Sequence, residues 1–110
     1  MLPGILRDRV TIQERVQTQK ATGVDEEWRD VQTRWGRVVP LSGEARVRYD
    51  QLKSEVTHEV VLRGVVDLVV GTHRFVWVNR ADTVLELTAP REDRDGRQRL
   101  TVAGVKEQGV

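Results

Sequence analysis

The sequence contains no cysteine, and this absence removes two classes of structure. No disulfide framework can hold the chain together, and no thiolate is available for a metal site. Cysteine usage therefore does not indicate a compartment, although it is compatible with a reducing cytoplasm. The fold has to rest on a hydrophobic core, and 110 residues suffice for one modest core. We expect a single domain spanning residues 1–110.

Long hydrophobic runs are also missing. The first residues, MLPGILRDR, hold only a few apolar side chains before Arg7, too few for the core of a signal peptide. No apolar run approaches the length of a membrane span. We expect a soluble chain without an export signal.

An excess of charge of one sign is the third absence. The chain has 18 basic and 17 acidic residues, and its formal net charge is +1. This balance argues against a nucleic-acid-binding protein whose affinity depends on bulk positive charge.

Signatures of catalysis and of metal or phosphate binding are absent as well. His58 and His73 have no second histidine or cysteine at ligand spacing. Ser42 lies in LSGEA, which is not the G-x-S-x-G of a nucleophile elbow, and no Walker-type glycine loop occurs. Residues 93–96 (DRDG) resemble the start of a calcium loop, but Gly104 occupies the twelfth position, where an acidic ligand is required. We expect no enzymatic activity, no cofactor and no metal.

Alternating apolar residues are present, and they predict short β-strands. The predicted strands lie in the stretches 8–16, 28–41, 56–64, 65–70, 73–80, 83–90 and 97–107. Between the last two, the pair Asp95-Gly96 ends a charged turn and is a strong hairpin signal. With one short helix, six or seven strands predict an all-β, mainly antiparallel fold, a small barrel or sandwich.

The stretch 73–80 is apolar on both faces, with Phe75 and Trp77 on one and Val76 and Val78 on the other. A strand of this kind is covered on both faces. In so small a domain we expect that the second cover is a neighbouring subunit.

The strand pattern breaks off near the middle of the chain. Gly36 is well placed for a bulge or bend, and Pro40 ends the strand because it has no N–H to donate. Ser42 is suited to cap a helix, and apolar residues then recur at helical spacing, at Ala45, Tyr49 and Leu52. This helix is too short to be stable alone, so its order must come from packing or from a partner.

The stretch 17–27 (QTQKATGVDEE) has no periodicity, and Val24 is its only large apolar residue. It predicts a long, solvated hairpin loop. Loops of this length tend to be functional or mobile.

The order of these features resembles a known family. The segments that carry the resemblance are RVTIQ in the first strand, the pair Trp28 and Trp35, PLSGEA, and VTHEVVLR after the helix. Together they are similar to the phage head–tail joining proteins, also called head-closure or stopper proteins, of siphovirus-like tailed phages. The resemblance extends from Leu6 to about Lys106.

This resemblance implies a structural virion protein rather than an enzyme. Such proteins form a homo-oligomeric ring at the head–tail interface, with the portal or adaptor on one side and the tail terminator or tail tube on the other. The ring keeps DNA inside the packed head and gives the tail its docking surface. Non-specific proximity to DNA in the channel, assembly in the host cytoplasm and no membrane contact are implied too. The gene could belong to a phage, a prophage or a gene transfer agent.

The resemblance also suggests two sites. In relatives an insertion between central strands can gate the channel, and it maps here onto residues 42–55. Its candidate residues are Ser42, Gly43, Glu44, Arg46, Arg48 and Lys53. The polar loop is a candidate contact with a neighbouring subunit, adaptor or tail protein, through Gln17, Lys20, Thr22, Val24, Asp25 and Glu26.

Arg46 and Arg48 leave an alternative open. On a helix they are a weak signal for phosphate contact, although a solvated helix face is the more ordinary interpretation. The alternative function is a small nucleic-acid-binding β-barrel module that uses these arginines and the strand faces.

Overall fold

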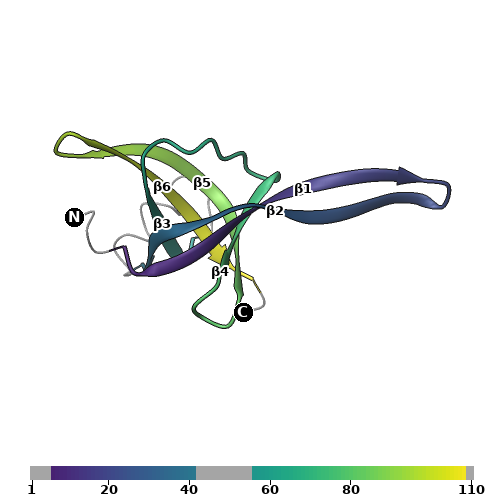
Figure 1. Ribbon diagram of the computed structural model, residues 1–110, viewed down its shortest axis with the longest axis horizontal. Helices are drawn as coiled ribbons and strands as arrows, with labels where there is room; N and C mark the ends of the chain where they lie inside the picture. Colours follow the sequence, from purple (N-terminus) through teal and green to yellow (C-terminus); the bar gives the residue numbers. More distant parts are fainter. Residues whose placement is uncertain (1–5, 42–55, 109–110) are drawn as a thin grey trace.

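The computed structural model describes residues 6–41 and 56–108, and in these ranges every regular element is a β-strand. The strands are β1 (Asp8–Lys20), β2 (Gly23–Pro40), β3 (His58–Arg63), β4 (His73–Trp77), β5 (Thr83–Asp95) and β6 (Gln98–Glu107). They form a closed antiparallel barrel in the order β1-β2-β3-β6-β5-β4 (Figure 1). The predicted all-β antiparallel fold is confirmed. The helix predicted from Ser42 lies outside the described residues.

The barrel core follows the alternation that the sequence predicts. Val10 and Ile12 of β1 lie opposite Trp77 and Phe75 of β4, and all four side chains are buried. The main cluster consists of Val10, Ile12, Val38, Val60, Leu62, Phe75, Trp77, Leu85, Leu87, Ala103 and Val105. Burying each large apolar side chain contributes about 1.5–3 kcal/mol, so this cluster is the main source of the barrel's stability.

The sequence predicts a bulge or bend at Gly36, and the bulge that the structure contains lies at another residue of β2. The β1–β2 register shifts between Ile12 and Gln13, where Ile12 faces Gln32 and Gln13 faces Asp30, so the extra residue is Val31. A bulge adds one residue to one strand and bends it. The bulge in β2 is therefore at Val31, before Gly36.

Gly36 serves close packing instead. A Cβ atom there would lie 2.8 Å from Leu62 Cδ2 and 3.0 Å from the Val61 carbonyl oxygen. At this residue β2 changes partner, because its ladder with β1 ends at Gly36 and its ladder with β3 starts at Arg37. As predicted, the strand ends at Pro40.

Residues 65–70 do not form the predicted strand. Gly64 has a φ of 85°, and the Thr101 hydroxyl donates to its carbonyl oxygen over 2.8 Å. The same hydroxyl accepts a hydrogen bond from the Val66 N–H at 2.9 Å. A side chain thus satisfies backbone groups that a neighbouring strand would otherwise pair. Val66 and Leu68 still pack against the core, which explains their apolar character.

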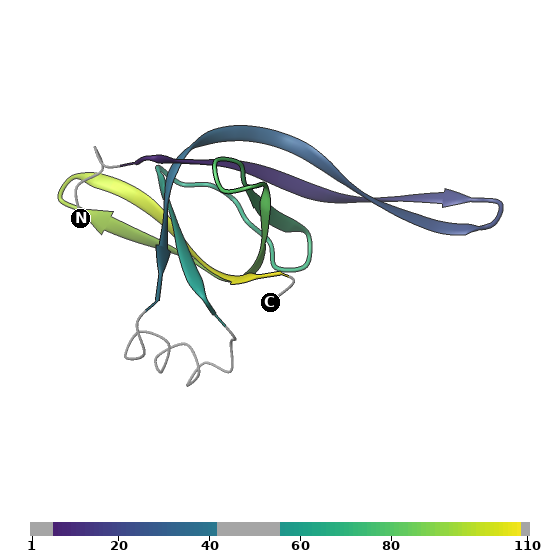
Figure 2. The same ribbon diagram turned by 90° about the horizontal axis from the view of Figure 1, so that it is seen from below.

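The molecule is elongated because β1 and β2 continue beyond the barrel. Its principal axes measure 51, 28 and 25 Å, and the long axis follows the paired outer parts of these two strands (Figures 1 and 2). The described residues contain no helix long and apolar enough to cross a membrane.

Candidate functional site

The outer parts of β1 and β2, residues 14–20 and 23–30, form a two-stranded ribbon that we call the arm (Figure 2). The predicted long loop over residues 17–27 is therefore wrong. The ladder continues to the pair Lys20 and Gly23, and only residues 21 and 22 form the turn. Gly23 has a φ of 134°, a conformation that side chains disfavour. The ribbon lacks a buried face, so its sequence lacks the alternation that identifies a strand.

The structure places the predicted contact residues on this arm. Thr22 lies in the turn, and Gln17, Lys20, Val24, Asp25 and Glu26 lie in the ladder. All six are exposed, as the sequence predicts for a solvated segment.

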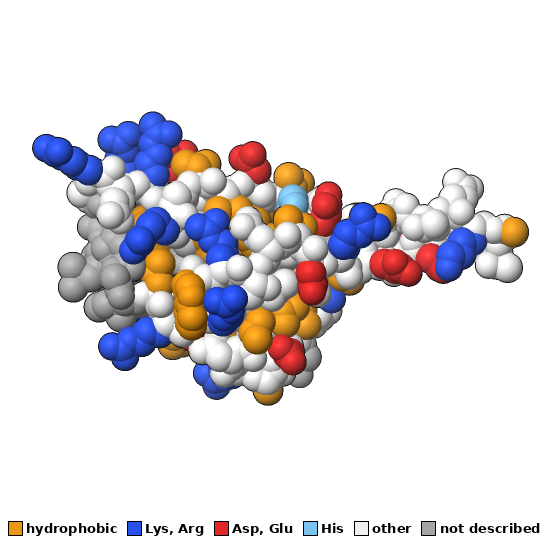
Figure 3. Space-filling view, viewed as in Figure 1, with side chains coloured by type: hydrophobic (Ala, Val, Ile, Leu, Met, Phe, Trp, Pro, Cys, Tyr) orange, Lys and Arg blue, Asp and Glu red, His pale blue; other side chains and the backbone are white. Residues whose placement is uncertain are grey.

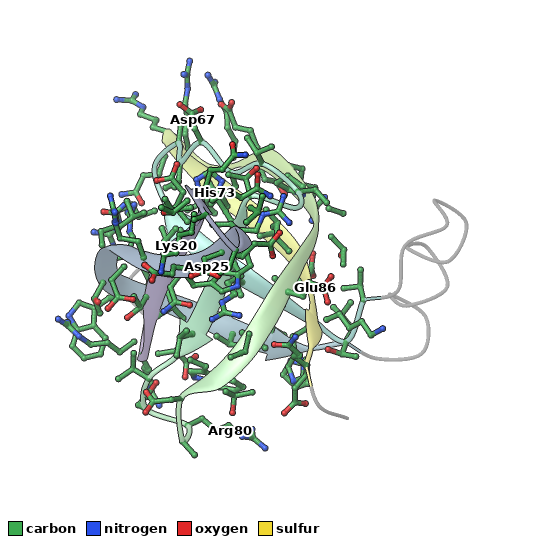
Figure 4. The ribbon with its side chains drawn as sticks, turned by 90° about the vertical axis from the view of Figure 1, so that its right-hand side faces the viewer. Lys20, Asp25, Asp67, His73, Arg80 and Glu86 are labelled. Carbon is green, nitrogen blue, oxygen red and sulfur yellow. The ribbon has the colours of Figure 1, made fainter. Side chains whose placement is uncertain are left out.

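Polar pairs across the two strands hold the arm together. Lys20 Nζ lies 2.6 Å from Asp25 Oδ2 (Figure 4). Gln17 Nε2 donates to Glu26 Oε1 at 3.1 Å, and Arg15 Nη1 lies 3.9 Å from the same oxygen. Exposed ion pairs of this kind are worth at most about 1 kcal/mol each, so they set the register of the arm more than they stabilise it.

The two faces of the arm differ because directly paired residues point to the same side of a ribbon. One face carries the pairs Gln17–Glu26 and Gln19–Val24, and we call it the Val24 face. Val24 is 59% exposed. The opposite face carries Thr18–Asp25 and the charged end of Lys20.

Both edges of the arm are open within the described part of the chain. The β1–β4 ladder ends at Glu14, and one further hydrogen bond joins the Arg15 N–H to the Thr72 carbonyl at 2.8 Å. On the other side, β2 has no partner besides β1 before Arg37. A two-stranded ribbon is marginal in water, and its open edges can pair with another chain. The arrangement can therefore bind a polypeptide.

The base of the arm is fixed to the barrel by stacking. The Arg74 guanidinium of β4 lies 4.2 Å from the Trp28 ring centroid, and Arg74 Nε donates to Gln13 Oε1 at 2.7 Å. Burial lowers the pKa of Arg74 from its ordinary value. Beside this stack is an open groove of about 260 Å³ that Val70, Trp28 and Arg74 help to line. These contacts hold the base of the arm against β4 of the barrel.

The tryptophans, expected in the core or at an interface, have different environments. Trp77 belongs to the core, and Trp28 is partly buried at the arm base. Trp35 is 54% exposed, and the Arg9 guanidinium lies 5.0 Å from its ring centroid. An exposed tryptophan under an arginine is typical of a contact surface.

The predicted gating residues Ser42, Gly43, Glu44, Arg46, Arg48 and Lys53 lie outside the described residues. The two ends of their segment are described, and they lie side by side. Pro40 pairs with His58, and the Leu41 N–H donates to the Thr57 carbonyl at 3.1 Å. The residues that flank the segment, at the ends of β2 and β3, are therefore neighbours.

His58, at the start of β3, packs against other side chains of the barrel. Its ring meets Trp77 edge-on, with 5.9 Å between the centroids, and its Nδ1 lies 2.8 Å from Thr57 Oγ1. Burial lowers the pKa of His58; Glu107 opposes this shift and Arg80 adds to it. His73 also has a structural role, because its Nδ1 accepts from the Val69 N–H at 2.9 Å. Across the described residues, no group of three or more metal-ligating side chains gathers.

Sequence reasoning missed a second feature, at the β5–β6 hairpin. These strands extend to Asp95 and Gln98, so the predicted hairpin exists but is longer than the charged turn suggests. On the outside of the barrel, Val61, Leu100 and Val102 form a separate buried cluster. They line a groove of about 240 Å³. The sequence feature that could have indicated this outer cluster was the adjacent pair Val60 and Val61, which places an apolar side chain on each face of β3.

Comparisons with known proteins agree with this architecture. A protein from Shigella flexneri 2a with a known solution structure is 29% identical and has a TM-score of 0.78, over 99% of this chain and 98% of that chain. A chain of the virion of a native gene transfer agent particle has a TM-score of 0.55 at 16% identity, over 94% of this chain and 98% of that chain. At this identity the likeness shows a shared fold. No curated protein matches the sequence.

A family model gives the relationship directly. The model described as phage head completion protein matches residues 1–107. The match confirms the resemblance to head-closure proteins that the ordered sequence features indicated. This chain belongs to the family of phage head completion proteins.

Proposed function

We propose that the chain forms a homo-oligomeric ring between the portal or adaptor and the tail. The ring closes the DNA-filled head and gives the tail its docking surface. One observation supports this beyond family membership: a closed barrel carries an arm that has no core of its own. A ring subunit needs a rigid body together with a surface that reaches its neighbours.

The arm is the proposed contact with the rest of the particle, through Gln17, Lys20, Thr22, Val24, Asp25 and Glu26. These exposed residues lie on a ribbon with open edges, which suits pairing with another chain. In a closed ring each subunit uses two different surfaces, one toward each neighbour. A projecting arm supplies one of them.

The segment 42–55 is the proposed channel gate, with Ser42, Gly43, Glu44, Arg46, Arg48 and Lys53 as its candidate residues. The resemblance supports this assignment, together with the neighbouring ends of the segment at Pro40 and His58. The near-neutral charge of the chain, +1, suits a channel for DNA, because tight phosphate binding would hinder passage.

Deletion of the gene tests the ring function. Electron microscopy of the lysate should show unjoined heads and tails, with heads that have lost DNA, and a plasmid copy should restore joined particles. Normal joined particles in the deletion lysate would overturn the proposal. Tight, steeply salt-dependent binding of duplex DNA by the isolated chain would also contradict it and favour a nucleic-acid-binding module.

The gate has a separate test. Replacing residues 42–55 with a short Gly/Ser linker should leave the barrel folded, as circular dichroism can verify, while filled heads lose DNA. An unfolded barrel would assign the segment to the core, and heads that keep their DNA would show that the segment is not the gate.

A further inference from the structure

The arm has two open strand edges, and the residues whose backbone groups point toward the β1 edge can be assigned. The Arg15 N–H donates to the Thr72 carbonyl oxygen at 2.8 Å, on the side where β4 pairs with β1. Alternate residues of an antiparallel strand direct their N–H and C=O groups to opposite sides. Gln17 and Gln19 therefore direct theirs to the same side as Arg15, which beyond Thr72 is an open edge.

The outward groups of the β2 edge follow from the pairing inside the arm. Gln17 lies opposite Glu26, and Gln19 lies opposite Val24. Because the two glutamines direct their backbone groups away from β2, Glu26 and Val24 direct theirs away from β1. On that side β2 has no ladder before Arg37 in the described part of the chain. Each copy therefore presents two different edges that can accept a strand.

The two edges differ in charge. Residues 15–20 carry two basic and no acidic side chains, and residues 24–30 carry four acidic and one basic. Figure 3 shows acidic and basic side chains along the arm. Like charges opposite one another destabilise a ladder. Two β2 edges would bring their acidic stretches together, whereas a β1 edge and a β2 edge attract each other.

Charge is the edge protection that this arm relies on. Residues 14–30 contain no proline, and their register is continuous because the bulge lies at Val31. Proteins usually keep an exposed edge from pairing with bulges, prolines, covering loops or charges. Here the charges oppose contact between like edges and leave contact between unlike edges favourable. Both unlike edges belong to this chain, so a second copy is the complementary partner.

We propose that the arms of neighbouring copies pair edge to edge, the β1 edge of one with the β2 edge of the next. The register within the arm repeats between copies, so that Gln19 faces Val24 and Gln17 faces Glu26 of the neighbour. The inference rests on the proposed ring and deepens it, because the arm then supplies the second of the two ring surfaces as well. A contact between unlike edges is heterologous, and its repetition can close into a ring.

The width of the barrel determines where the arms meet. Two strands take up about 9.6 Å of a sheet, whereas the two shorter axes of the molecule measure 28 and 25 Å. In a ring the barrels therefore lie further from the axis than the arms, and the arms converge toward their turns. Gln17, Gln19, Val24 and Glu26 lie near the turn, where we expect the contact.

The absence of cysteine makes this contact testable by disulfide formation. Particles are assembled from a mixture of Gln19→Cys and Val24→Cys chains and oxidised with copper phenanthroline. Opposite residues of a ladder have Cα atoms about 4.5–5.5 Å apart, within the range of a disulfide, so denaturing gels should show a dimer of this chain. Each variant alone should give none, because equivalent residues of neighbouring copies lie about 9.6 Å apart.

The chain offers matched controls. Gln19 and Val24 are also opposite each other within one arm, so a chain with both substitutions should form the disulfide internally. A mixture of Gln19→Cys and Val78→Cys chains should give no dimer, because Val78 is exposed on the barrel. Tilted strands pair with a stagger, and a stagger of two residues would bring Gln17 opposite Val24. Val24→Cys is therefore also mixed with Gln17→Cys.

The outcomes distinguish this inference from the ring function. Joined particles in which neither arm mixture gives a dimer would overturn the inference and leave the ring function intact. A dimer from one variant alone would overturn it in favour of contact between like edges. A Val24→Cys chain labelled with benzophenone maleimide that cross-links only to a different virion protein would overturn it in favour of an adaptor or tail contact. Joined particles in the gene-deletion lysate would remove the ring function on which it rests.

A mixing experiment tests the charges of the edges. Lys20→Glu combined with Asp25→Lys exchanges the charges of a pair within one arm, so the exchanged arm keeps its internal complementarity. Particles made only from the exchanged chain should be joined at close to the parental yield. In a 1:1 mixture with the parent chain the yield should fall at least about tenfold, since mixed contacts set like charges side by side. A mixture as productive as the parent would overturn the pairing of unlike edges.

Discussion

The barrel and the arm share strands β1 and β2, yet the side chains of the two regions lie in opposite environments. Within the barrel, Val10 and Ile12 of β1 are almost fully buried, whereas Val24 in the arm is 59% exposed. The barrel is closed, so its ladders leave no edge, and the arm has two open edges. The residues that stabilise the folded barrel are therefore different from the arm residues, which we propose connect the chain to a particle.

The largest expected effect tests the barrel half of this comparison. Phe75→Ala removes a fully buried ring and should lower the free energy of unfolding by about 3–5 kcal/mol. The matched arm variant Val24→Ala should change it by less than about 0.5 kcal/mol. Urea unfolding followed by tryptophan fluorescence measures both. Similar losses in the two variants would abolish the distinction between the regions.

The next effect concerns the position where β2 passes from β1 to β3. Gly36→Ala places a methyl group 2.8 Å from Leu62 Cδ2, so a neighbour must move. We expect a loss of about 1–3 kcal/mol from overpacking, measured by thermal unfolding. Gly23→Ala in the arm has open space but a strained φ of 134°, and it should leave the barrel's melting temperature nearly unchanged. A neutral Gly36→Ala would contradict the close-packing role.

A smaller effect is expected at the junction of the two regions. Arg74→Ala removes the stack on Trp28 and the hydrogen bond to Gln13. Exposed cation–π contacts contribute about 0.5–1 kcal/mol, so the barrel should lose little stability. Amide hydrogen exchange in residues 14–30 should nevertheless accelerate relative to the barrel strands. Unchanged exchange in the arm would show that the stack does not hold its base.

The smallest effect is a pH dependence in the barrel. The folded state lowers the pKa of His58 below its ordinary value of 6.5, chiefly through burial. The neutral ring is therefore favoured by folding, and its stabilisation is present above pH 6.5 and lost as the pH falls below it. His58→Gln should flatten the melting temperature between pH 7.5 and 5.5 relative to the parent chain. An equally steep dependence in the variant would assign it to other groups.

The sequence predicts the barrel well because its strands have one buried and one outer face. Val10 and Ile12, or Phe75 and Trp77, alternate with outward residues, and this pattern is a direct consequence of burial. The strands of the arm were predicted as a loop for the same reason, since a ribbon exposed on both faces has no such alternation. Only the structure reveals that the two strands of the arm pair, in a register that places Gln17 opposite Glu26.

Two other differences come from tertiary contacts that a local pattern does not contain. Residues 65–70 have the apolar content of a strand, but the Thr101 hydroxyl, far away in the sequence, takes the backbone hydrogen bonds. Gly36 is a strong bulge signal locally, and only the approach of Leu62 from β3 shows why glycine is needed there.

Removal of the arm tests the central claim most directly. Replacing residues 16–27 with an Asn-Gly turn keeps the pair Arg15 and Trp28 and closes a shorter hairpin. The melting temperature should stay near that of the parent chain, because no core residue is lost. Complementation of a deletion strain with this variant should fail to restore joined particles in electron micrographs. Normal joined particles, or a barrel that no longer folds, would contradict the separation of folding body and connecting arm.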